Sequence, residues 1–136
     1  MDDLTQGNQP RGGKAMVWTG WAITGVISAM LIMSGVMKLV SGGPEFEEAI
    51  AKIGIPKSMI VPLGILELAC VAIYLVPQTS IVGAILLTGY LGGAICTHWR
   101  VDEAFFVQAI LGVVVWLGIY LREPRLRAIM PLRGAP

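Results

Sequence analysis

Charge is scarce in this chain, and the charged residues that it has leave long apolar stretches between them. Only 14% of the 136 residues are Asp, Glu, Lys or Arg, whereas a soluble domain carries about 25%. The formal net charge is +1, so no basic field is available to bind nucleic acid. Histidine occurs once and cysteine twice, without a Cys-x-x-Cys or a paired metal-ligand motif. The composition argues against a thiol-exchange enzyme and a nucleic-acid-binding protein, and no metal site is predicted.

Four long apolar runs occupy most of the chain, at residues 16–40, 59–76, 81–97 and 104–121. A helix that spans a bilayer needs about 20 apolar residues, within a range of roughly 17 to 25. The last three runs lie at the short end of this range, which suits a thin or locally thinned bilayer. No run has a polar stripe wide enough to face water, which disfavours a soluble helical bundle. The sequence therefore predicts an all-α integral membrane protein that contacts the lipid bilayer through four spans.

The segments outside these runs predict an orientation. Residues 1–15 read as a disordered polar arm and residues 122–136 as a basic tail, so the transmembrane domain covers residues 16–121. Six of the ten Lys and Arg residues lie on the side of the two termini and four on the other side. Because positive charge is retained in the cytoplasm, both termini are predicted to be cytoplasmic. The first run is too long for a signal peptide and is predicted to be a retained span.

The links between the runs predict how the spans are arranged. Residues 77–80 and 98–103 are short links, and short links make consecutive helices antiparallel neighbours. The first link is longer, and Pro44 followed by three glutamates is typical of a helix N-terminus. Gly54 and Pro56 can end that helix. We expect an antiparallel four-helix bundle, with a short amphipathic helix between spans 1 and 2 that lies on the outer membrane surface or caps the bundle.

Small residues are expected to form the contacts between spans, because they allow helix backbones to approach closely in lipid. Gly25 and Ala29 form one pair spaced four residues apart, and Gly89 and Gly93 form another. Gly64 adds a small residue to the second span. Such pairs predict packing and carry no chemistry.

Polar side chains interrupt the apolar runs mainly toward the predicted outer side. Glu67 is the one acidic residue of the second run and lies roughly 12 Å from the start of that helix. A carboxylate at this depth is costly unless it is paired and faces the bundle interior, and Lys38 can turn inward to reach it. The candidate site draws polar residues from the first, second and fourth runs and from the outer end of the third: Ser34, Lys38, Glu67, His98 and Gln108.

Three interpretations of this cluster remain open from the sequence. Lys38 and Glu67 can form a buried pair that only locks the helix register. The cluster can instead line a pocket, open to the outer side, that binds a small molecule or handles protons. In the third arrangement Lys38 extends to the interface and Glu67 stays neutral. A single His at a membrane interface is more often a hydrogen-bonded cap than a ligand, so His98 is not assigned to a metal.

The two cysteines are not expected to form a disulfide. Cys70 lies near the middle of the second span and Cys96 at the outer end of the third. Their depths differ by roughly 10 Å or more at the rise of a helix, beyond the alpha-carbon separation that a disulfide allows. No nucleophile or phosphate-binding motif occurs either. Catalysis by this chain alone therefore lacks support.

Three stretches of the sequence resemble the DoxX-like family of small four-helix bacterial inner-membrane proteins. They are SGVMKLVSG at the end of the first run, GILELACVAIYLVP in the second and GGAICTHWR at the end of the third. The resemblance covers residues 22–121. The residues that match its motifs are Gly35, Lys38, Leu39, Gly64, Glu67, Leu68 and His98.

This resemblance implies a location in a bacterial inner membrane. The family is named for a membrane subunit of a thiosulfate:quinone oxidoreductase, which implies a subunit or anchor of a larger redox-linked complex. A protein partner or a homo-oligomer, and a quinone as the associated cofactor, would follow. The alternative is a small proton-coupled transporter or carrier that uses Glu67. Many relatives have no assigned activity, so catalysis does not follow from the resemblance.

Overall fold

A computed structural model describes residues 12–40 and 42–130, and within these ranges it contains six helices and no strand. The helices are α1 (Gly12–Val40), α2 (Pro44–Lys52), α3 (Lys57–Leu75), α4 (Ser80–Trp99), α5 (Phe106–Arg122) and α6 (Pro124–Ile129). The all-α prediction is confirmed. Residues 12–15, which the sequence assigned to the N-terminal arm, are helical, and α6 lies in the segment read as a plain basic tail. The rest of the arm and residues 131–136 lie outside the described residues.

The long helices have an apolar exterior. Helices α1, α3 and α4 are long and apolar enough to cross a membrane, and α5 is a shorter apolar helix of 17 residues. Large hydrophobic side chains are exposed along every one of them, for example Val26, Ile65, Ile85 and Val113. A soluble monomer rarely exposes apolar surface so continuously. The exterior is that of a protein surrounded by lipid.

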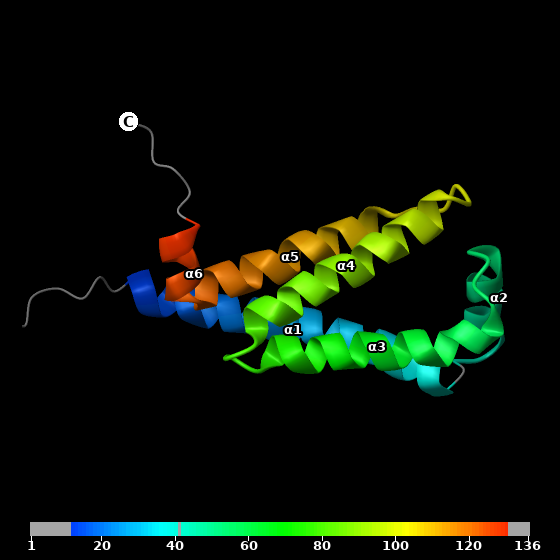
Figure 1. The fold of residues 1–136 in the computed structure, drawn as a ribbon, viewed down its shortest axis with the longest axis horizontal. Coiled ribbons are helices and arrows are strands. Elements are labelled where there is room, and N and C mark those ends of the chain that lie inside the picture. Colours follow the sequence, from blue (N-terminus) through cyan, green and yellow to red (C-terminus); the bar gives the residue numbers. More distant parts are fainter. Residues whose placement is uncertain (1–11, 41, 131–136) are drawn as a thin grey trace, which may run out of the picture.

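The four long helices form a ring in which each helix packs against two others. Helix α1 packs against α3 and α5, and α4 packs against the same two helices. Figure 1 shows α1 beside α3 and α4 beside α5, with the two pairs close together near α6 and separated at the opposite end. We call the end with α6 and the 76–79 turn the closed end. The end with α2 and the 100–105 link is the open end.

The closed end is held by a buried tyrosine and a buried arginine. The Tyr74 hydroxyl donates a hydrogen bond of 2.8 Å to the Val115 carbonyl, and Arg122 Nη2 donates one of 2.9 Å to the Tyr74 carbonyl. The last carbonyls of a helix lack partners within the helix, so Arg122 satisfies one at the end of α3. The Arg122 guanidinium also lies 4.3 Å from the centre of the Trp21 ring, close enough for a cation–π interaction.

Glycines form the close contacts between helices, but Gly64 is the one member of the predicted packing residues that makes such a contact among the described residues. A Cβ on Gly64 would lie 2.9 Å from the Gly35 carbonyl oxygen, so Gly64 lies at the α1–α3 contact. Gly25, Gly89 and Gly93 have nothing within 4 Å of such an atom, and Ala29 is exposed. These four residues therefore make no close helix contact among the described residues: Gly25 and Ala29 are on exposed faces, and the space beside Gly89 and Gly93 is open. The close contacts involve Gly20, Gly35, Gly64, Gly83 and Gly118.

Helix α2 has the features expected from its sequence. Pro44 occupies its first turn, and Gly43 and Gly54 flank it with φ of 92° and 70°, a conformation that glycine adopts readily. Ile50 of α2 and Ile53, which follows the helix, are buried, although α2 lies at the open end and outside the packed helices (Figure 1). The amphipathic helix predicted between the first two apolar runs is present.

Candidate functional site

An ion pair joins α1 to α3 near the open end. Lys38 Nζ lies 2.8 Å from Glu67 Oε2, and Glu67 is only 2% exposed. The Lys38 ammonium also donates a hydrogen bond of 2.6 Å to Ser34 Oγ, whose hydroxyl donates one of 3.3 Å to the same Glu67 oxygen. Ser34 and Lys38 are one helical turn apart, so both reach one carboxylate. The Lys38–Glu67 contact predicted from the sequence is therefore present. The Lys38 ammonium and the Ser34 hydroxyl both donate to Glu67 Oε2.

A second polar pair joins α4 to α5. His98 Nδ1 lies 2.8 Å from the Ala94 carbonyl oxygen, which can only accept, so this nitrogen carries the proton. His98 Nε2 then accepts a hydrogen bond of 3.2 Å from Gln108 Nε2. The other end of the amide, Gln108 Oε1, is buried and has no partner among the described residues. The pair thus leaves one buried acceptor free.

Both pairs line one cavity of about 910 Å³ that extends inward from the open end. Its volume lies within the range of roughly 300 to 1,000 Å³ that is usual for small-molecule sites. All five candidate residues, Ser34, Lys38, Glu67, His98 and Gln108, contribute to its lining. The lining is otherwise largely apolar, with residues such as Leu31, Leu91 and Leu111 from three different helices.

Tyr90 also lines the cavity, and the sequence reasoning missed it. Helical spacing gives only a weak signal for it, because Tyr90 lies eight residues before His98 and eight residues turn a side chain by about 80° around the helix. A tyrosine within an apolar run attracts less notice than a charged residue. It adds a hydroxyl, which can donate and accept, to the polar groups of the cavity.

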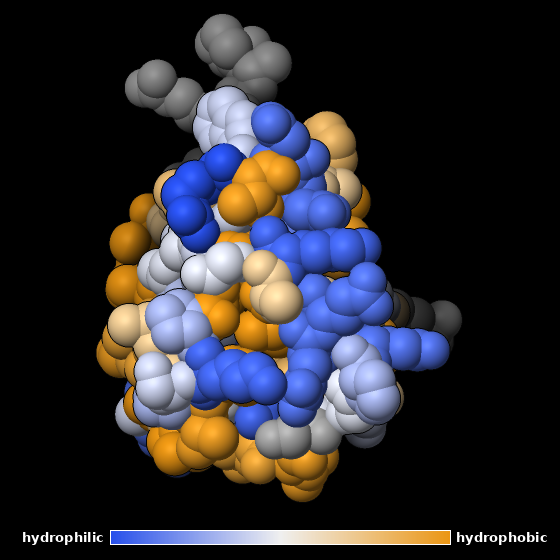
Figure 2. Space-filling view, turned by 90° about the vertical axis from the view of Figure 1, so that its right-hand side faces the viewer, coloured by the Kyte–Doolittle hydropathy of each residue, from blue (hydrophilic) through white to orange (hydrophobic). Residues whose placement is uncertain are grey.

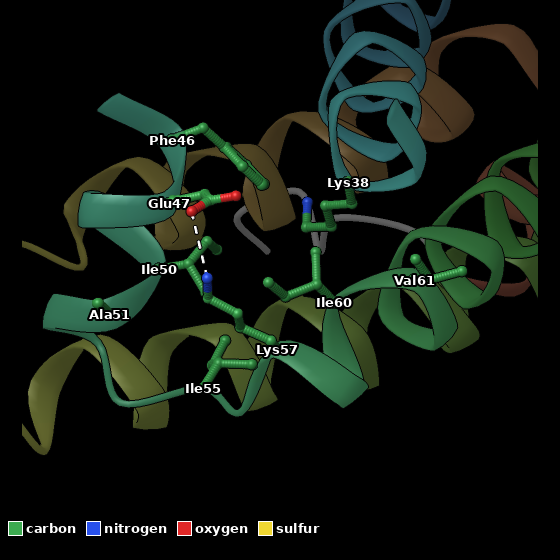
Figure 3. Close-up of a pocket in the computed structure, with 9 residues that line it drawn as sticks. All are labelled: Lys38, Phe46, Glu47, Ile50, Ala51, Ile55, Lys57, Ile60 and Val61. Atoms are coloured by element: carbon green, nitrogen blue, oxygen red, sulfur yellow. Dashed lines mark hydrogen bonds and ion pairs between the residues drawn. The ribbon is translucent and has the colours of Figure 1, made fainter. Parts of the chain in front are cut away.

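A smaller cavity of about 130 Å³ lies between α2 and the start of α3. Figure 3 shows Phe46 and Ile50 of α2 on one side of it and Ile60 of α3 on another, with Lys38 reaching in from α1. Lys38 lines both cavities and so lies between them. The dashed contact in Figure 3 is the exposed ion pair of 3.2 Å between Lys57 and Glu47.

The open end is a polar surface with an apolar centre. Figure 2 looks onto this end and shows hydrophilic residues around apolar side chains. Arg100 Nη2 donates a hydrogen bond of 3.0 Å to the Ile53 carbonyl, which ties the end of α4 to the end of α2. Together with the Lys57–Glu47 pair, this bond keeps α2 over the cavity.

The remaining reactive residues do not join the site. Cys70 is buried, Cys96 is exposed, and both are free thiols. Within residues 12–40 and 42–130, no group of three His, Cys, Asp or Glu side chains could hold a metal ion. The chemistry of the cavity therefore comes from its hydrogen-bonding groups and from the Lys38–Glu67 pair.

A family model described as the DoxX-like family matches residues 22–120, which include all the polar residues of the cavity that have been named. The chain belongs to the DoxX-like family. No curated protein and no solved structure matches it. Family membership and the apolar helices together identify a membrane protein.

Proposed function

We propose that this DoxX-like protein is a membrane subunit that binds a quinone, or a molecule of similar chemistry, in the cavity at the open end. The observation that carries the proposal is the convergence of two hydrogen-bonded pairs, from four helices, on one largely apolar cavity. A register lock needs only one pair and no cavity. A binding site for an apolar ring with polar substituents needs an apolar cavity and hydrogen-bonding groups that line it.

The polar groups suit both redox forms of a quinone. The carbonyl oxygens of the oxidised ring need donors, and the Tyr90 hydroxyl lines the cavity as one. The three Lys38 N–H groups already bond Ser34 and Glu67, so Lys38 can serve as a donor only by giving up its 3.4 Å bond to the Ser34 carbonyl. The hydroxyls of the reduced ring need acceptors, which the Glu67 carboxylate and the unpartnered Gln108 Oε1 can supply. The role of the chain is to bind and orient this molecule for a partner protein in a larger complex.

The proposed setting is a bacterial inner membrane that α1, α3, α4 and α5 cross as an antiparallel bundle, with α5 as the shortest span. The closed end faces the cytoplasm and the open end faces outward. Support comes from the ten Lys and Arg residues, six of which belong to the side with the two termini. The cavity then opens toward the outer side.

A proton-coupled carrier is the second candidate. The observation that favours it is Glu67, a charged side chain that is 2% exposed and lies ten residues into α3. Buried carboxylates of this kind serve as proton relays in membrane transporters. Experiment can distinguish a carrier from a subunit, because a carrier would take up protons together with its substrate and would not need a partner protein.

Binding can be measured on the protein in nanodiscs with decylubiquinone as the probe and empty nanodiscs as the blank. We expect Glu67→Gln and Lys38→Met each to weaken binding by about tenfold or more, the effect of losing one hydrogen bond with a charged group. Glu47→Gln and Lys57→Met make the same chemical changes in an exposed pair outside the larger cavity and should bind like the wild type.

Two results would count against the subunit. If wild-type protein binds no more decylubiquinone than empty nanodiscs do, the proposed quinone site is refuted. Equal binding by all four variants would show that the Lys38–Glu67 pair takes no part in it. Substrate-driven proton uptake by proteoliposomes that is lost in Glu67→Gln, without quinone binding, would favour the carrier.

A further inference from the structure

The cavity reaches the apolar exterior of the molecule through its side as well as through the open end. Leu66 of α3 and Gly89 and Gly93 of α4 line it, and all three residues are exposed. A Cβ on either glycine would meet nothing within 4 Å, so no side chain fills the space beside α4. Helices α3 and α4 are consecutive and packed together. This side opening therefore lies along their shared edge.

The side opening is at a depth where lipid is apolar. Gly89 lies ten residues before Trp99, the last residue of α4, which corresponds to about 15 Å along the helix. The hydrocarbon core is about 30 Å thick, so this depth is close to its middle. Glu67 lies at a similar depth, ten residues into α3, and lines the same cavity.

The approach at the open end has the opposite character. The cavity lining there includes exposed charged residues of α2 and of the link after α4, namely Glu45, Glu48, Lys52 and Glu103. An apolar chain placed among these side chains would stay in contact with water or would cost the charges their hydration. At the side opening the exposed lining residues Leu66, Gly89 and Gly93 are apolar or small. The two openings thus suit different parts of one amphipathic ligand.

We propose that the opening between α3 and α4 is the passage for the apolar tail of the ligand, which lies against Gly89 and Gly93 and extends into the lipid. The polar head lies among Lys38, Glu67, Tyr90 and Gln108. This inference rests on the proposed function and adds a ligand class to it. The site takes a tailed, lipid-borne molecule that enters from the membrane, and it discriminates against a water-soluble head group without a tail.

The other side of the cavity is lined by larger side chains. Met30 of α1 and Val107 of α5 line the cavity and are exposed, so the α1–α5 side carries side chains at these positions. Glycine at two positions one turn apart is specific to the α4 side. Gly89 and Gly93 are therefore assigned as specificity-determining residues rather than helix-packing residues.

The test compares a tailed and a tailless probe in nanodiscs of phosphatidylcholine. The probes are decylubiquinone and 2,3-dimethoxy-5-methyl-1,4-benzoquinone, which share one head group. The variants are Gly89→Leu and Gly93→Leu, which place a side chain in the opening. Gly25→Leu is the matched control, because Gly25 is exposed, has nothing within 4 Å of a Cβ and does not line the cavity. Leu is a better helix former than Gly, so folding should not suffer.

We expect each variant of Gly89 and Gly93 to lose about tenfold in affinity for the tailed probe, the effect of losing contact with two buried CH₂ groups. Affinity for the tailless probe should stay within about twofold, and Gly25→Leu should change neither. Equal losses for both probes, or no loss for either, would overturn the tail passage. A loss with Met30→Trp but not with Gly93→Leu would also overturn it, because the tail would then leave between α1 and α5.

The same measurements separate this inference from the proposed function. If wild-type protein binds both probes and the glycine variants do not distinguish them, the tail passage fails and the quinone site stands. If wild-type protein binds neither probe above empty nanodiscs, the quinone site fails and the tail passage fails with it.

Discussion

Removing one partner of the Lys38–Glu67 pair should cost far more stability than breaking an exposed ion pair of the same chemistry. Lys38 Nζ and Glu67 Oε2 are 2.8 Å apart, and the two side chains are 15% and 2% exposed. Removing one partner of a buried pair costs about 3–5 kcal/mol, because the other charge is left without compensation. The Lys57–Glu47 pair is 81% and 50% exposed, and pairs of that kind contribute about 0.2–1 kcal/mol.

The two single substitutions should not cost the same. In Lys38→Met the Glu67 carboxylate keeps only the Ser34 hydroxyl and has almost no access to water. In Glu67→Gln the Lys38 ammonium keeps Ser34 Oγ and the Ser34 carbonyl and remains partly exposed. We therefore expect Lys38→Met to lie near the upper end of the 3–5 kcal/mol range and Glu67→Gln near or below its lower end.

The assay is reversible unfolding of the purified protein in mixed micelles, followed by far-UV circular dichroism. The double variant Lys38→Met/Glu67→Gln should recover part of the loss, with an interaction energy of about 1–3 kcal/mol. Lys57→Met is the matched control and should lose under about 1 kcal/mol. Strictly additive losses, or a loss for Lys38→Met no larger than for Lys57→Met, would refute the reasoning.

Three further predictions follow from the fold. A reporter enzyme that is active only outside the cytoplasm should be inactive when fused after Pro136; activity there would reverse the proposed orientation. Arg122→Met should lower the free energy of unfolding by about 1.5–3 kcal/mol, since it removes a buried charged donor to the Tyr74 carbonyl. Arg125→Met, at an exposed position, should not lower it. Equal effects of the two substitutions would show that Arg122 does not stabilise the closed end. Gly83→Ala should destabilise the protein strongly, because a Cβ there would overlap the backbone of Tyr74, whereas Gly25→Ala should be neutral or stabilising; similar unfolding curves for the two would contradict the packing of α3 on α4.

The sequence by itself determined the helices and indicated Lys38 as the partner of Glu67. Long apolar runs can satisfy their backbone groups in lipid only as helices or closed barrels, and link lengths limit how consecutive helices are placed. Lys38 and Glu67 could be matched because a buried carboxylate needs a partner and few residues at that depth carry a positive charge. The α2 helix followed from Pro44 at its start and Gly54 at its end.

The tertiary structure decided which face of each helix points inward. Gly25, Gly89 and Gly93 were read as packing residues, yet their faces are open, and Gly20, Gly83 and Gly118 make the close contacts instead. The cavity, which the sequence left as one of three interpretations, and the place of Tyr90 in it were likewise decided by the packing. In a soluble protein the apolar face of a helix marks the interior. Lipid tails are as apolar as a protein core, so in a membrane the hydrophobic pattern does not distinguish inside from outside, and only the packing of the neighbouring helices does.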